Sequence, residues 1–295
     1  SSHFGSSLKS WLFFVCSPLA LVRALGSMSA EDPLAVINDH IRRHGDAPSA
    51  AAKGGPEWLA LESNPAVFNA FGAHIGVPAG WEFVDVLGLD EALLDLVPQP
   101  VAALILLFPC TRGIYDARRA QDKELLVGRG VVEESLFFLR QVADFGNACG
   151  TIGCLHALSN SLHILNMVEG AALVNFVHAQ SGATPEERGE ALLTADALKA
   201  PSDAAAVDAA AQTVCPARDG RPLDHHFVAF VQTPGGRLVE LDGTKRCPID
   251  HGPTSPENFL SDAASVVLRQ FVAAEPDLHG FAVMALARNE GDGAG

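Results

Sequence analysis

The segment that most constrains the fold is an uninterrupted apolar run, Val101–Phe108, which lies between Pro100 and Pro109. A strand with one face in water alternates apolar and polar residues, and this run does not. It is also far shorter than the roughly 20 apolar residues that span a bilayer as a helix. A short, continuous apolar run is typical of a strand that is covered on both faces. We therefore predict a central strand of a sheet over these residues.

A chain of 295 residues, 48% of them apolar and 19% charged, can bury the core that such a strand requires. This length fits one large domain or, less simply, two, and the composition excludes an intrinsically disordered protein. The formal net charge of -15 would repel nucleic acid and anionic membrane, so we expect neither as a partner. The same charge would attract basic partners, although solubility alone explains it equally well.

Six cysteines are spread along the chain without paired spacings, which does not fit a small secreted disulfide scaffold. A reduced compartment fits better, so we expect a cytoplasmic protein, with the nucleus as a second location. An apolar run of about twelve residues, 11–22, follows Lys9. It reads either as the central region of a signal peptide or as leader sequence upstream of Met28. We predict a flexible N-terminal segment over residues 1–56.

Periodicity and turn residues predict the remaining elements. Apolar residues at helical intervals predict a helix that includes Val67, Phe71 and Ile75. The stretch Leu193–Asp219 is rich in Ala, Asp and Pro, and we expect a long exposed loop there. The other expected elements are strands over Trp81–Leu87 and Phe281–Ala287, a strand pair His226–Val231 and Leu238–Leu241, and helices over Glu133–Gln141, from about Cys149, and from Ser255 to about Ala274.

The segment Gly146–Gly153 places one cysteine, Cys149, among small residues at the expected start of a helix. A thiol there lies beside unpaired backbone N–H groups and the positive end of the helix dipole. Both favour the thiolate, so we expect the pKa of Cys149 to fall below its free value. The alternative is a small cysteine buried in the core. A substrate backbone could approach the sulfur closely because the neighbouring glycines carry no side chains.

The strand pair suggests a partner for this thiol. Pairing the two strands about Pro234 places His226 opposite Asp242, close enough for the carboxylate to accept a hydrogen bond from the imidazole. A carboxylate in this position fixes the ring tautomer and stabilises the imidazolium that forms when the ring takes a thiol proton. Taken singly, His226 could be a core or surface histidine, and Asp242 a turn residue before Gly243. Together with Cys149 they predict nucleophilic catalysis.

Two further features concern the surroundings of the thiol. The side-chain amide of Gln141 could donate to a developing oxyanion together with the Cys149 N–H, although a surface glutamine is the simpler interpretation. Cys149, Cys154 and His156 could be read as zinc ligands. The two cysteines are five residues apart on one helix and point to different faces, so we expect no metal. The chain also lacks a Gly-x-Ser-x-Gly elbow and a Gly-x-x-x-x-Gly-Lys loop.

These residues carry a resemblance to the ubiquitin carboxyl-terminal hydrolase family of thiol peptidases, and in particular to its short, single-domain branch. The resemblance covers about residues 57–288 and leaves a flexible tail over 289–295. The segments that carry it, in family order, are Trp58–Pro65, Phe83–Val86, Val97–Pro100, Gln141, Asn147–Gly153, Thr184–Arg188, His226-Phe227, Glu240–Gly243 and Pro248–Gly252.

The resemblance implies an α+β, papain-like fold with an antiparallel sheet flanked by helices and a knotted backbone. It implies Cys149 as nucleophile, His226 as general base and acid, Asp242 as the residue that orients it, and Gln141 as oxyanion donor. The substrate would be the bond after the C-terminal glycine of ubiquitin, or of a ubiquitin-like modifier, and a monomer without a cofactor would cleave it. Residues 197–222 match a crossover loop over the site, which would admit only small or unfolded leaving groups.

The resemblance also implies residues that line a channel for the ubiquitin tail, and the sequence departs from the family pattern at one place. Trp58, Leu61, Glu62 and Phe281 match positions that bind the ubiquitin tail, although core packing explains Trp58 and Phe281 nearly as well. Seven residues, 142–148, separate Gln141 from the nucleophile, two more than is usual in the family. Unless two extra residues, Asp144-Phe145 or their neighbours, bulge out, the Gln141 amide cannot aim at the oxyanion. The alternative function is therefore a ubiquitin-binding protein with weak turnover.

Overall fold

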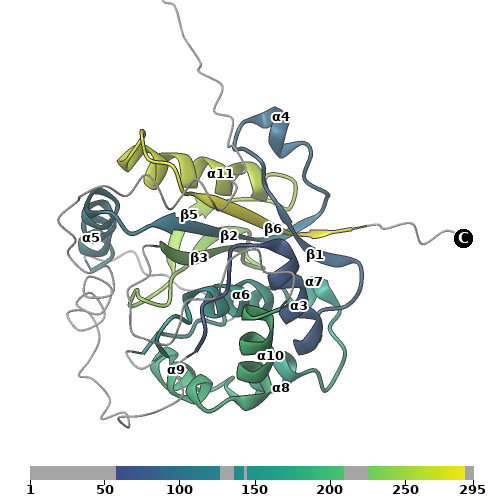
Figure 1. Cartoon of the computed structure of the whole chain (residues 1–295). Helices are drawn as coiled ribbons and strands as arrows, with labels where there is room; N and C mark the ends of the chain where they lie inside the picture. Colours follow the sequence, from purple (N-terminus) through teal and green to yellow (C-terminus); the bar gives the residue numbers. More distant parts are fainter. Residues whose placement is uncertain (1–57, 127–135, 143–144, 209–224, 290–295) are drawn as a thin grey trace, which may run out of the picture.

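A six-stranded sheet forms the middle layer of the molecule (Figure 1). The computed structural model describes residues 58–126, 136–142, 145–208 and 225–289. The strand order is β1-β6-β2-β3-β4-β5, and every strand pair described is antiparallel. The strands are β1 (Trp81–Asp85), β2 (Val101–Pro109), β3 (His225–Gln232), β4 (Arg237–Leu241), β5 (Ile249–Pro253) and β6 (Ala282–Arg288).

The predicted central strand is confirmed. β2 lies between β6 and β3, and its side chains alternate between two separate cores. Ala103 and Ile105 pack in the core on one face, whereas Leu104 and Leu106 pack in the core on the other. Both faces of the strand are therefore covered, as its continuous apolar sequence requires.

Helices cover the two faces of the sheet unequally (Figure 1). α11 packs against β2 and β4 on one face, and α6 packs against β2 and β3 on the other. The helices beside α6 are α3 (Pro65–Ile75), α7 (Leu162–Leu165), α8 (Ala172–Ala179), α9 (Pro185–Leu193) and α10 (Asp196–Ala206), and α6 itself is Cys149–Asn160. The elements beside α11 (Phe259–Gln270) are α4 (Glu91–Leu94), α5 (Arg112–Leu126) and the 3-10 helix η2 (Val272–Ala274).

The helix predicted around Phe71 is confirmed as α3, and its ends follow from local chemistry. The Asn64 side chain accepts a hydrogen bond from Ala66 N (2.9 Å), and Pro65 occupies the first turn. At the other end Gly76 adopts a left-handed φ of 108°, which glycine accommodates without steric cost. The α11 helix begins at Phe259, a little later than the predicted start at Ser255.

Two predictions from local sequence were wrong. The described part of the segment predicted as a helix, 136–141, is extended and buried throughout, and residues 133–135 lie outside the described residues. Within the predicted loop 193–219, residues 196–206 form α10, with Leu198, Ala205 and Ala206 buried. The high alanine content that suggested a loop is favourable in a helix. Residues 209–219 lie outside the described residues.

Among the helices that the structure describes, none combines the length and the apolar character that crossing a bilayer requires.

Candidate active site

Cys149 is the first residue of α6 and is 8% exposed. Ile152 N–H donates to Ala148 O (2.8 Å), so the N–H groups of the preceding residues come before the first helical hydrogen bond. Gly150 allows the helix to lie close to its neighbours, because an added Cβ would be 3.2 Å from Leu61 Cβ. The predicted helix start is therefore confirmed, with the sulfur at the end where the helix dipole favours an anion.

His226 projects from β3 and is 1% exposed. Its Nε2 lies 2.9 Å from Asp242 Oδ1, and because an ionised carboxylate only accepts, the ring nitrogen donates. Nδ1 has no hydrogen bond of ordinary geometry within the described residues. Burial lowers the pKa of His226, but the charge and the hydrogen bond of Asp242, together with the nearby Cys149 thiol, raise it more, to about 9. The ring therefore lies between a carboxylate and the thiol.

The predicted contact between His226 and Asp242 is present, but the register that predicted it was wrong. Ala229 pairs with Leu241, so the hairpin is centred on Gly235 rather than on Pro234. The cause is a three-residue loop whose last residue, Gly236, is left-handed (φ 73°). His226 and Asp242 are consequently diagonal neighbours on one face, a separation that a long side chain still bridges.

Both carboxylate oxygens of Asp242 have polar partners. Oδ1 also accepts from Thr244 N (2.9 Å) and Thr244 Oγ1 (2.7 Å), and Oδ2 pairs with Arg118 Nη2. Arg118 Nη1 lies 2.8 Å from Glu240 Oε1, and Glu240 Oε2 lies 2.9 Å from His251 Nε2. These contacts join the imidazole of His226 to a buried network of charges.

This network holds its acids ionised. Burial raises the pKa values of Asp242 and Glu240, but the neighbouring cations have a larger, opposite effect. The pKa of Glu240 falls to about 2, and that of Asp242 falls well below its usual value. The pKa of Arg118 rises, because the charges of the two acids outweigh burial. The Arg118 guanidinium also lies over the rings of Phe108 (5.2 Å) and Phe271 (5.0 Å).

The site also includes Arg118, Glu240 and His251, which were not predicted from the sequence. Glu240 carried a usable signal, since it is two residues from Asp242 on a strand and therefore shares its face. Arg118 carried none, because its partners lie more than 120 residues further along the chain.

Gln141 lies beside the turn that follows Asp242. Its N–H donates to Gly243 O (2.8 Å), and an added Cβ at Gly243 would lie 3.2 Å from Gln141 Cβ and 3.1 Å from Ile152 Cγ2. Gly243 therefore lets this segment approach the first turn of α6. The side-chain Oε1 is buried without a partner in the described residues. The residues predicted to bulge out were Asp144 and Phe145 or their neighbours. Residues 143–144 lie outside the described residues, and Phe145 is buried against Trp58.

The residues predicted to bind substrate are placed as follows. Leu61 is buried and packs against Gly150, the residue that follows Cys149. Trp58 is 1% exposed and Phe281 is also buried, and Glu62 is half-buried. Their role in binding ubiquitin stays a prediction, and core packing accounts for the burial of Trp58 and Phe281.

Metal ligation is not supported by the described residues, among which no three His, Cys, Asp or Glu side chains gather around a common point. Cys154 is fully buried, and burial raises the pKa of its thiol. His156 is also fully buried and contacts the backbone of Leu139.

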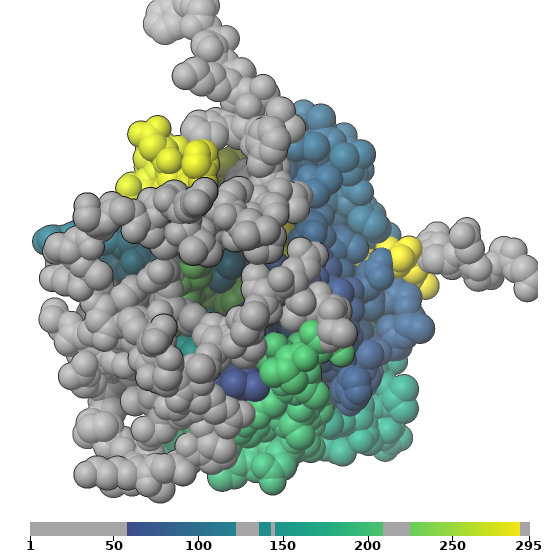
Figure 2. Space-filling view, in the orientation of Figure 1, coloured from purple at the N-terminus to yellow at the C-terminus, as the bar shows by residue number. Residues whose placement is uncertain are grey.

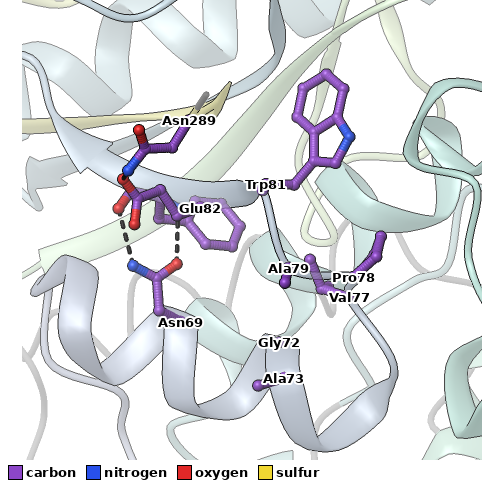
Figure 3. Close-up of a pocket in the computed structure, with 11 residues that line it drawn as sticks. Asn69, Gly72, Ala73, Val77, Pro78, Ala79, Trp81, Glu82 and Asn289 are labelled. Carbon is purple, nitrogen blue, oxygen red and sulfur yellow. Dashed lines mark hydrogen bonds between the residues drawn. The ribbon is translucent and has the colours of Figure 1, made fainter. Parts of the chain in front are cut away.

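A cavity of about 420 Å³ lies elsewhere, between α3 and β1 (Figure 3). The Asn69 side chain on its wall accepts from Phe83 N (2.7 Å) and donates to Phe83 O (3.0 Å), so these polar groups already serve the fold. Trp81 and Pro78 supply apolar lining, and the residues of the candidate active site are not part of it.

Comparison with known proteins identifies the family. Residues 58–273 match the family model described as ubiquitin carboxyl-terminal hydrolase, family 1. A ubiquitin carboxyl-terminal hydrolase of Drosophila melanogaster is 38% identical over 232 residues, which are 78% of this chain and 96% of that protein. The human isozyme L1 is 36% identical over 228 residues, which are 77% of this chain and 97% of that protein.

A solved structure has the same fold. The catalytic domain of Trichinella spiralis UCH37, bound to ubiquitin vinyl methyl ester, matches with a TM-score of 0.61 and 20% identity, covering 82% of this chain and 99% of that chain. The six-stranded antiparallel sheet with helices therefore agrees with the fold of this family. The chain belongs to family 1 of the ubiquitin carboxyl-terminal hydrolases.

Proposed function

We propose that this protein is a thiol-dependent deubiquitinase that hydrolyses the bond after the C-terminal glycine of ubiquitin. Membership of the family supports the reaction, and the site supplies groups that can perform it. The observation that carries the proposal is the buried His226 ring, which interacts with Asp242 through Nε2 (2.9 Å) and also with the Cys149 thiol.

In the proposed mechanism Cys149 is the nucleophile and His226 moves the proton. His226 takes the thiol proton, and the thiolate attacks the carbonyl carbon of ubiquitin's last glycine. The imidazolium then protonates the leaving amine as the carbon–nitrogen bond breaks, which leaves a thioester. Water, deprotonated by His226, attacks the thioester and releases ubiquitin and the thiol. Asp242 holds the ring in position and stabilises its charged form.

Gln141 completes the proposed site as an oxyanion donor, together with the backbone N–H of Cys149. The Oε1 atom of Gln141 has no hydrogen-bond partner among the described residues, so the amide is not fixed through its oxygen, and no side chain caps the start of α6. Donors that are held in place and unpaired can stabilise the charge that develops on the carbonyl oxygen.

The finer features of the family are proposals as well. They include a papain-like and knotted chain path, a monomer, a cytoplasmic or nuclear location and the acceptance of a ubiquitin-like modifier. We also propose that the crossover segment restricts leaving groups to small or unfolded ones. Its first part, α10, is tied beside the nucleophile, since Ser202 Oγ lies 2.6 Å from Thr151 Oγ1 and Asp203 Oδ1 accepts from Leu59 N (3.1 Å). In Figure 2, α10 (green) meets the start of the described chain (purple) at the surface.

The alternative, a ubiquitin-binding protein with weak turnover, rests on the seven-residue spacing before Cys149. Steady-state cleavage of an amide at the ubiquitin C-terminus separates the two. An enzyme gives many turnovers, whereas the alternative predicts labelling by an electrophilic ubiquitin probe without repeated turnover.

The residue assignment is tested with two cysteines of one helix. Cys149→Ala should abolish turnover and probe labelling and leave ubiquitin binding nearly intact. Cys154→Ala is the matched control, because this thiol is fully buried in the core. This variant should keep both turnover and probe labelling. Full activity in Cys149→Ala would refute the assignment.

A further inference from the structure

The extended segment 136–142 lies between helices, and its backbone partners alternate from side to side. On one side Phe138 O accepts from Arg188 Nη1 (3.1 Å), and Arg140 N donates to Pro185 O (2.9 Å) at the start of α9. The intervening residues face the other way, where Gln141 N reaches Gly243 O. This alternation is that of a β-strand, although the partners are not strands.

Two side chains of α6 provide the partners on the second side. Asn160 Oδ1 accepts from Phe137 N (2.8 Å) while its Nδ2 donates to Phe137 O (2.8 Å), so the amide imitates a neighbouring strand. His156 Nε2 lies 3.2 Å from Leu139 N and 3.1 Å from Leu139 O. One turn of the helix thus engages two alternate residues of the segment.

His156 is buried on every side and stacks on the Phe138 ring, with centroids 5.3 Å apart and an interplanar angle of 21°. Burial lowers the pKa of His156 to about 4, despite the opposing effect of the Leu139 carbonyl. The ring is therefore neutral at physiological pH and acts through its position and hydrogen bonds.

These contacts set a register between the segment and the nucleophile. His156 and Asn160 are seven and eleven residues after Cys149, spacings that return to the same face of a helix. Phe137 contacts Asn160, and Leu139 contacts His156, which is nearer the start of α6. The segment therefore runs towards the start of α6. From His156 back to Cys149 the helix rises about 10.5 Å, and from Leu139 on to Gln141 an extended chain advances about 6.6 Å. The glutamine side chain can span the remaining distance of about 4 Å.

We propose that His156 and Asn160 are positioning residues that set the register of Gln141 relative to Cys149. A slip by one residue would move Gln141 by about 3.3 Å and turn its side chain to the opposite face. The two contacts lie on the N-terminal side of Gln141, so the longer connection to Cys149 does not alter them. This inference rests on the proposed function, because it assumes that Gln141 is the oxyanion donor.

The test measures steady-state turnover of a ubiquitin C-terminal amide by His156→Leu and Asn160→Ala. We expect kcat to fall by up to about 100-fold, as for a catalytic group misplaced by about 1 Å, with little change in KM. Alkylation of Cys149 by iodoacetamide should stay close to the wild-type rate, since it does not need the oxyanion donor. His156→Gln should restore part of kcat because its amide can also bond to Leu139.

Ser159→Ala is the matched control, because Ser159 is buried on the same helix and its hydroxyl has no partner in the described residues. It should keep the wild-type kcat. Asn160 is only partly buried, so Asn160→Ala remains informative if His156→Leu does not fold.

A double-mutant cycle with Gln141→Ala separates positioning from general damage. If Asn160 acts through Gln141, Asn160→Ala should cost little further kcat once the amide is gone. Losses that multiply in the double variant, or single variants with wild-type kcat, would overturn the inference while leaving the proposed function intact. A wild-type protein without turnover would instead contradict the proposed function, and this inference with it.

Discussion

Asp242 connects the reacting groups to the rest of the fold, because its two carboxylate oxygens serve different partners. Oδ1 accepts from His226 (2.9 Å) and from Thr244, whereas Oδ2 pairs with Arg118. An isolated carboxylate would not stay ionised at this depth. The cations around it hold its pKa well below the usual value, so it can orient and stabilise a charged imidazole.

Replacing Asp242 by Asn should lower kcat by about 10²- to 10⁴-fold, because the amide keeps the shape but not the charge that orients the ring. The loss should be smaller than that in Cys149→Ala. Turnover of a ubiquitin C-terminal amide measures it, and Asp250→Asn, at a partly exposed ion pair with Arg237, is the control that should keep wild-type kcat. Unchanged turnover in Asp242→Asn would remove Asp242 from the site.

Replacing Arg118 by Met should destabilise the protein by about 3–5 kcal/mol, since two buried carboxylates lose their common cation. Urea denaturation at pH 7 measures the change. Arg119→Met is the control, because Arg119 pairs with the exposed Asp116 and should cost no more than about 1 kcal/mol. Equal effects of the two substitutions would mean that the buried network contributes little.

At the scale of elements, the first turn of α6 positions the nucleophile against its neighbours. This turn presents Cys149, Gly150 packs against Leu61 and Phe227, and Gly153 lies one turn further along. The two glycines have different surroundings. A Cβ at Gly150 would be 3.2 Å from Leu61 and from Phe227, whereas at Gly153 the nearest contact would be an ordinary 3.5 Å.

Gly153→Ala should therefore raise stability by about 0.5–1 kcal/mol, the usual gain of alanine over glycine within a helix, and leave turnover unchanged. Gly150→Ala should lower both stability and kcat, because the new methyl displaces α6 next to the thiol. Thermal denaturation and steady-state kinetics on the pair provide the comparison. A Gly150→Ala variant as active and stable as Gly153→Ala would refute the close packing.

The elements that could be predicted are those whose signals are local. The apolar run of β2 indicates burial on both faces, and Gly and Asn residues around Cys149 indicate the start of α6. The segment 136–141 could not be predicted, because six consecutive buried residues have no period and their backbone partners, such as His156, lie elsewhere. Arg118 was equally hidden, since a cation in a helix of mixed charge usually faces solvent.

At the scale of the whole molecule, the fold shifts the pKa values of two buried histidines in opposite directions. Burial lowers the pKa of His156 to about 4, whereas Asp242 and Cys149, against the effect of burial, raise that of His226 to about 9. Between pH 4 and 6.5 the unfolded chain binds the extra proton at His156, so stability increases with pH. The proton that His226 takes up is the one that the Cys149 thiol gives to it, so this transfer does not change the number of bound protons and adds no pH dependence of its own.

The free energy of unfolding should therefore rise by about 3 kcal/mol from pH 4 to pH 6.5. Urea denaturation across this range measures the profile. His156→Gln should remove much of this rise, because the titrating ring is gone. A wild-type profile that is flat from pH 4 to 6.5 would show that the fold does not hold His156 neutral.

The most direct test of the central claim, a thiolate formed beside an imidazole that Asp242 orients, is the rate of Cys149 alkylation by iodoacetamide at pH 6. Wild-type protein should react readily, because the imidazole of His226 takes the proton from the Cys149 thiol. His226→Gln should react at least about 10-fold more slowly, with Asp242→Asn between the two. Equal rates in wild type and His226→Gln would contradict the account.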